Sequence, residues 1–108
     1  MSGMTEPTDY VTVARQALVG ELEAIGSRVT QRADLLDLYT LLLLSKGPSV
    51  TGKDVHDAWA VRQVRIRPDH YSIIPYEQLD PEKHAKDDKY VQAIIRSHEK
   101  IHGVEGKK

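Results

Sequence analysis

The sequence lacks several features that would assign it to a class of protein. It has no cysteine, which excludes disulfide frameworks, thiolate zinc sites and thiol nucleophiles. Its longest apolar run, residues 41–44, is far short of the roughly 20 residues that a membrane-spanning helix needs. It has no excess of charge either, because 15 basic and 16 acidic residues leave a formal net charge of -1. That balance argues against a general affinity for nucleic acid or for an anionic membrane.

What remains is the composition of an ordinary globular domain. We expect one domain over residues 9–103, with a disordered N-terminus over residues 1–8 and a flexible tail over residues 104–108. The first residues have no basic stretch followed by an apolar one, so we expect no secretory signal. Together with the missing cysteine, this predicts a cytoplasmic protein with no membrane contact.

Apolar residues at helical spacing predict an all-α fold of about four helices. We expect the first helix over residues 9–25, with Asp9 as its N-cap and Gly26 as its stop. The second helix is expected from a Thr30 cap to about Ser45. It is apolar almost all round, which predicts that it is the most buried of the four.

The third helix is expected over residues 52–66, because Thr51 and Asp54 resemble a capping box at its start. Pro68 ends it, since the residue before a proline is pushed out of the helical region. Residues 70–79 are then expected to form one ordered, extended loop between the third and fourth helices.

The last helix is less well bounded by the sequence. A short extended piece near residues 71–74 and a short turn near residues 81–85 are expected to precede it. Asp87 or Asp88 would then cap it, and Gly103 would end it.

A possible metal motif lies near the end of the chain. His98-Glu99-x-x-His102 matches the pattern in which two histidines bind zinc and the glutamate acts as general base. Catalytic zinc needs a third protein ligand, and only residues 103–108 follow, although His84 is a candidate from elsewhere. The alternative is that His98 packs on the apolar stripe while His102 favours the negative helix C-terminus. We favour this structural role, and expect no metal, no cofactor and no catalytic residue.

The second and third helices have the outline of a helix-turn-helix, in which a glycine-containing turn joins two helices. Three arginines near the end of the third helix could contact phosphates or read guanine edges. However, the connection around residues 46–49 looks long, and recognition helices read bases from their N-terminal end. There, Asp54 and Asp57 would repel phosphates. A DNA-binding regulator is therefore the alternative function, and we do not expect a nucleic-acid partner.

The strongest functional signal is a crowd of basic and aromatic side chains over residues 55–76. Aromatic faces stack on planar rings, and arginines bind phosphate or carboxylate with two hydrogen bonds. Such a mixture suits a small, planar, anionic ligand such as a nucleotide. The candidate ligand-binding residues are His56, Trp59, Arg62, Arg65, Arg67, His70 and Tyr76. The competing interpretation is structural, with Trp59 as a core anchor, His56 bonded to nearby backbone and Tyr76 closing the loop.

Two motifs in this stretch resemble the ryanodine-receptor repeat domain. Residues 55–60 resemble that family's H-[DE]-x-W-[AS] signature, and residues 70–79 resemble its H-P-x-L-x-P-[YF]-x-x-L segment. The resemblance covers residues 54–102, with Tyr71 where the family has proline and residues 62–68 in place of an insertion. The sequence also resembles short proteins encoded by phages of actinobacteria.

The resemblance implies a helical, non-enzymatic binding module that acts in the cytoplasm of a bacterial host. It implies a nucleotide-like ligand or a host protein as partner. Carried over residue by residue, it points to His56, Trp59, His70, Pro75 and Tyr76.

The first helix lies outside this resemblance and carries its own prediction. It is amphipathic, and a small domain with a limited core gains stability by burying such a stripe against a second copy. We therefore expect residues 9–25 to take part in a homodimer.

Overall fold

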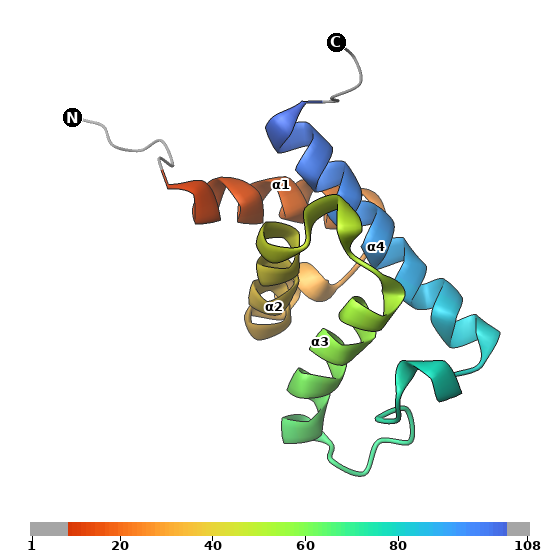
Figure 1. The fold of residues 1–108 in the computed structure, drawn as a ribbon. Coiled ribbons are helices and arrows are strands. Elements are labelled where there is room, and N and C mark those ends of the chain that lie inside the picture. Colours follow the sequence, from red (N-terminus) through yellow and green to blue (C-terminus); the bar gives the residue numbers. More distant parts are fainter. Residues whose placement is uncertain (1–8, 104–108) are drawn as a thin grey trace.

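The computed structural model describes residues 9–103, and within this range the chain is all-α, with four α-helices and no strand. The predicted fold class is therefore confirmed, including the ordered loop between the third and fourth helices (Figure 1). The predictions for residues 1–8 and 104–108 lie outside the described residues. None of the helices in the described range is long and apolar enough to cross a membrane.

Helix α1 spans Tyr10–Ala24, and Asp9 caps it as predicted by accepting a hydrogen bond from the Thr12 backbone N–H. Helix α1 packs against α4 and α2 of the same chain (Figure 1). The fully buried members of its apolar stripe are Ala14, Leu18 and Leu22, whereas Val13 and Ile25 are 37% and 36% exposed. The homodimer through residues 9–25 stays a prediction.

Helix α2 spans Ala33–Ser45 and begins later than predicted. The expected Thr30 cap is wrong, because Thr30 lies inside a short 3-10 helix, η1, over Val29–Gln31. The N-cap position is held by Arg32 without a side-chain hydrogen bond. With five buried residues among 13, α2 has the largest buried share of the four helices, as predicted, although Leu41 and Leu44 are 58% and 39% exposed.

Helix α3 spans Gly52–Ile66, as the sequence predicts. Both halves of the capping box are present: the Thr51 side chain accepts from the Asp54 N–H, and Asp54 accepts from the Thr51 N–H. A second 3-10 helix, η2 over Gly47–Ser49, joins α2 to α3. Helix α3 packs against both α2 and α4.

Helix α4 is a single helix over Pro81–His102, so the predicted turn at residues 81–85 is wrong. Asp80 caps it by accepting from the Lys83 N–H, and proline is tolerated at the first helical position. The predicted caps Asp87 and Asp88 lie inside the helix. One unbroken helix therefore carries residues 81–102 across α1, α2 and α3.

The loop between α3 and α4 contains a third 3-10 helix, η3 over Tyr76–Gln78, and the extended piece expected near residues 71–74 is not a strand. Two buried or half-buried histidines fix the loop backbone. His56 Nε2 on α3 lies 2.7 Å from the Ile74 carbonyl oxygen, and His84 Nε2 on α4 lies 2.8 Å from that of Tyr76. The loop is thus held against both helices.

Candidate binding cleft

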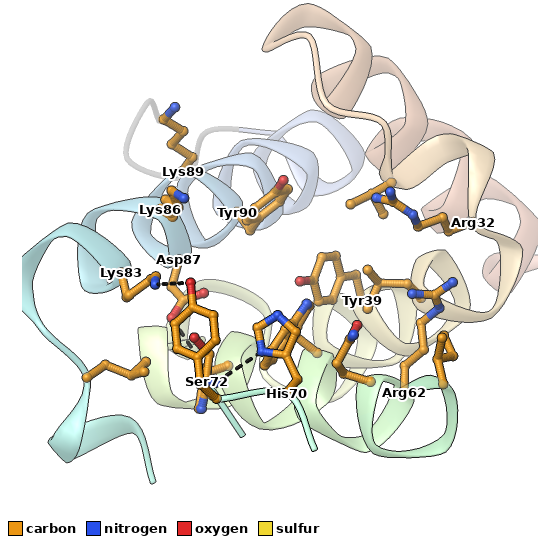
Figure 2. A pocket seen from close by; sticks show the side chains of 18 residues that line it. Arg32, Tyr39, Arg62, His70, Ser72, Lys83, Lys86, Asp87, Lys89 and Tyr90 are labelled. Atoms are coloured by element: carbon orange, nitrogen blue, oxygen red, sulfur yellow. Dashed lines mark hydrogen bonds and ion pairs between the residues drawn. The ribbon is translucent and has the colours of Figure 1, made fainter. Parts of the chain in front are cut away.

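A cleft of about 700 Å³ lies between α3, α4 and the loop, and η1 and α2 close its far side (Figure 2). Rings line much of it, from α2, α3, the loop and α4: Tyr39, His56, Trp59, His70, Tyr71 and Tyr90. Five cationic side chains also line it: Arg32, Arg62, Lys83, Lys86 and Lys89. Its volume lies within the range typical of sites for small ligands.

Four of the rings form a continuous series. Tyr71 stacks on His70, with ring centroids 4.9 Å apart, and His70 meets Trp59 edge-on at 5.2 Å. Trp59 in turn stacks on His56 at 5.6 Å. This series ties the loop to α3 and gives the cleft a wall made of ring faces and edges.

The series continues away from the cleft through Tyr76. Its ring lies 6.2 Å from that of His56 and stacks on His84 at 4.2 Å. A Cβ atom at Gly52 would approach the Tyr76 Cζ atom to 2.9 Å, so Tyr76 fits closely over the start of α3. Tyr76 does not line the cleft. Its contacts match the structural interpretation, in which it closes the loop.

The cations stand in two groups. Figure 2 shows Lys83, Lys86 and Lys89 from α4 on one side and Arg32 and Arg62 on the other. Tyr39, His70 and Tyr90 lie between the two groups (Figure 2). The cleft is thus basic at both ends and aromatic in the middle.

Arg62 is the cleft cation with an acidic partner. Its Nε donates to Asp34 Oδ1 at 2.8 Å, and Arg65 Nη2 lies 3.4 Å from the other oxygen of Asp34. The hydrogen bond from Arg62 lowers the pKa of Asp34 below its usual value. Arg65 therefore shares the carboxylate of Asp34 with Arg62, and it does not line the cleft.

The other four cations of the cleft are not neutralised by the described part of the chain. Among residues 9–103, no carboxylate oxygen lies within 4.0 Å of the charged nitrogens of Arg32, Lys83, Lys86 or Lys89. Lys83 instead donates to the Tyr71 hydroxyl at 3.4 Å and lies over its ring, 4.8 Å from the centroid.

Asp87 is the one acidic side chain among the described residues that line the cleft. Its Oδ2 is buried without a hydrogen-bond partner, and lies 4.0 Å from Nδ1 of the buried His56. Burial raises the pKa of Asp87 to about 6, although the nearby His56 and His84 act in the opposite direction. Burial is also the main cause of the raised pKa of Tyr39, to which the charges of Tyr90 and Asp87 add.

The tautomer of His56 follows from its partner on the loop. A carbonyl oxygen can only accept, so Nε2 of His56 carries the hydrogen that bonds Ile74. In a neutral His56, Nδ1 therefore has a lone pair, and it faces Asp87 Oδ2. An ionised Asp87 gains no hydrogen bond from a neutral His56.

The structure brings four of the seven candidate residues to the cleft: His56, Trp59, Arg62 and His70. The other three, Arg65, Arg67 and Tyr76, do not line it. The cleft also contains residues that are not among the seven predicted ones: Arg32, Tyr71, Asp87 and the three lysines of α4. The lysines recur at every third position, which places them on one face of a helix. Because a turn was predicted at residues 81–85, the three lysines were not expected to share one helix.

The two alternative motifs gain no support from the geometry. The rings of His98 and His102 lie 4.4 Å apart, but within residues 9–103 no group of three or more potential ligands could hold a metal ion. In the helix-turn-helix interpretation, Arg62 and Arg65 should be free for phosphate, whereas both are engaged by Asp34.

Comparison with known proteins gives one match. Residues 9–99 match the family model described as "Domain of unknown function (DUF7701)". No curated protein and no solved structure matches the chain. The matched range begins at the N-cap of α1 and reaches the last turns of α4, so it includes every element that forms the cleft. The resemblances to the ryanodine-receptor repeat and to phage proteins stay predictions.

Proposed function

The chain belongs to the DUF7701 family, and we propose from its cleft that it is a non-enzymatic module that binds a nucleotide-like anion. The observation that carries the proposal is a set of four cations around a ring-lined cleft that have no carboxylate partner among residues 9–103. Unpaired cations on a concave surface attract an anion, because low-dielectric walls concentrate their field. The rings add stacking surface for a planar group.

The arrangement of the cleft matches the two parts of a nucleotide. The lysines of α4 can bind phosphate oxygens, while Trp59, His70 and Tyr71 offer ring faces and edges to a base. On the other side, Arg32 can contact a second anionic group, and the guanidinium of Arg62, which Asp34 holds, can stack on a base.

The histidines of the cleft each hold loop backbone through one ring nitrogen. His56 Nε2 donates to the Ile74 carbonyl, and His70 Nδ1 accepts from the Ser72 N–H at 3.0 Å. These contacts support a structural role for both rings in the wall of a binding cleft. The action in a host cytoplasm and a host-protein partner stay predictions from the resemblance.

Titration with guanosine monophosphate, followed by calorimetry, tests the proposal. We expect saturable binding that weakens about tenfold or more when Lys83→Ala and Lys86→Ala are combined, because hydrogen bonds from charged groups contribute about 1.5–3 kcal/mol. The matched control combines Lys53→Ala with Arg67→Ala, which removes two exposed cations from outside the cleft.

The control variant should bind the nucleotide as the wild type does. Equal weakening in both double variants would mean that net charge, not the cleft, drives binding. Absence of binding at millimolar nucleotide would overturn the proposal.

A further inference from the structure

One side chain has a charge opposite to that of the other charged groups in the cleft. Asp87 places a carboxylate in a cleft that is otherwise basic, where its charge would repel the phosphate of a nucleotide. An acidic residue in such a place needs a reason either in the fold or in the ligand.

The fold supplies no reason among the described residues. Asp87 is well inside α4, so it caps no helix end. Its Oδ2 has no hydrogen-bond partner, and its 4.0 Å separation from His56 Nδ1 is too long for a hydrogen bond. A buried carboxylate oxygen that accepts nothing destabilises the folded state.

Neutralisation of the lysines is not the reason either. Lys83 and Lys86 are one helical turn and one residue away from Asp87, yet neither ammonium group lies within 4.0 Å of its carboxylate. The carboxylate oxygen Oδ2 lies instead 4.0 Å from Nδ1 of His56, which also lines the cleft.

We propose that the Asp87 carboxylate, whose Oδ2 has no hydrogen-bond partner among the described residues, turns from its buried position beside His56 to accept a hydrogen bond from the ligand, which makes the ligand a nucleoside phosphate whose base or sugar presents an N–H or O–H donor. The inference rests on the proposed function and narrows it. The lysines bind the phosphate, and Asp87 distinguishes a donor-bearing nucleotide from a planar anion without donors. A ligand lacking the donor leaves a buried acceptor unpaired, which is the strongest basis for rejection in a polar site.

Two probes separate these ligand classes. Guanosine monophosphate has N–H donors on its base and O–H donors on its sugar, whereas 1-naphthyl phosphate is planar and dianionic without any donor. At about pH 8, above the second phosphate pKa of about 6, both phosphates are fully ionised. Calorimetric affinities are measured for the wild type, for Asp87→Asn and for the neighbouring control Asp88→Asn, whose exposed side chain does not line the cleft.

The expected result is a loss of affinity for the nucleotide without a loss of affinity for 1-naphthyl phosphate. Asp87→Asn should weaken guanosine monophosphate binding about tenfold, because the charge-assisted hydrogen bond is lost. The same change should leave 1-naphthyl phosphate unchanged or strengthen its binding, because a nearby negative charge is removed. Asp88→Asn should leave the ratio of the two affinities as in the wild type.

The outcomes separate this inference from the proposed function. If both probes bind the wild type and Asp87→Asn changes their affinities equally, the inference is wrong and the anion-binding cleft stands. Binding of 1-naphthyl phosphate without binding of the nucleotide overturns both the inference and the nucleotide-binding proposal, and leaves only a cleft that binds planar anions. If neither probe binds at millimolar concentration, the proposed function fails and the inference fails with it.

Discussion

Asp87 and His56 are close neighbours in the wall of the cleft, with Oδ2 and Nδ1 4.0 Å apart. The titratable groups around Asp87 come from four elements: His56 on α3, Tyr39 on α2, Tyr76 on η3, and His84, Asp88 and Tyr90 on α4. Burial dominates, so the folded protein keeps a proton on Asp87 up to a pH near 6. Such a group lowers stability once it is ionised.

The sign of the resulting pH dependence follows from linkage. The pKa of Asp87 is about 6 in the folded protein against a usual value of 3.8, so between these values the folded state binds more protons than the unfolded state. The contribution of Asp87 to the free energy of unfolding therefore falls as the pH rises from about 4 to about 6.

Replacement of this carboxylate by its neutral amide tests that linkage. We expect Asp87→Asn to raise the free energy of unfolding by about 1–3 kcal/mol at neutral pH, and by nothing measurable below about pH 4. Urea unfolding at a series of pH values measures the difference. Asp88→Asn, on the exposed side of α4, should change stability by less than about 0.5 kcal/mol. A destabilised Asp87→Asn at neutral pH would contradict the pKa and its cause.

At the scale of the helices, the sequence predicts correctly those helix ends that are set by hydrogen bonds between residues close in sequence. The start of α3 is correct to the residue because Thr51 and Asp54 exchange hydrogen bonds over four positions. The predicted starts at Thr30 and at Asp87 or Asp88 failed because threonine and aspartate also occur in 3-10 turns and in helix interiors. Only a short turn was predicted near residues 81–85, whereas Asp80 and Pro81 begin the whole of α4.

The start of α4 gives an element-scale prediction. Asp80→Ala removes the side-chain acceptor of the Lys83 N–H and should lower the free energy of unfolding by about 1 kcal/mol. Asp88→Ala, inside the same helix, should be neutral or slightly stabilising, because alanine is the better helix former. Thermal unfolding of the two variants measures both effects. If Asp88→Ala were instead the more destabilising of the two changes, α4 would start at the predicted cap, Asp87 or Asp88, and not at Asp80.

At the scale of the whole molecule, the cleft depends on contacts that no local pattern reveals. Four residues of the cleft are close in sequence, and the local frequency of basic and aromatic side chains was enough to group them: His56, Trp59, Arg62 and His70. Arg32 and the lysines of α4 join them only through the packing of α2 and α4 around α3. The same packing buries the centre of the α1 stripe, through which the sequence predicts a contact with a second copy of the chain.

The most direct test of the binding cleft is the map of amide chemical shifts during a titration with guanosine monophosphate. The chain has a single tryptophan, so the indole N–H of Trp59 gives an isolated reporter inside the cleft. We predict saturable shifts that are largest at Trp59, at Arg32, at the loop around His70 and along residues 83–90 of α4. Shifts concentrated on α1 or at His98 and His102, or no saturable shift, would contradict the account.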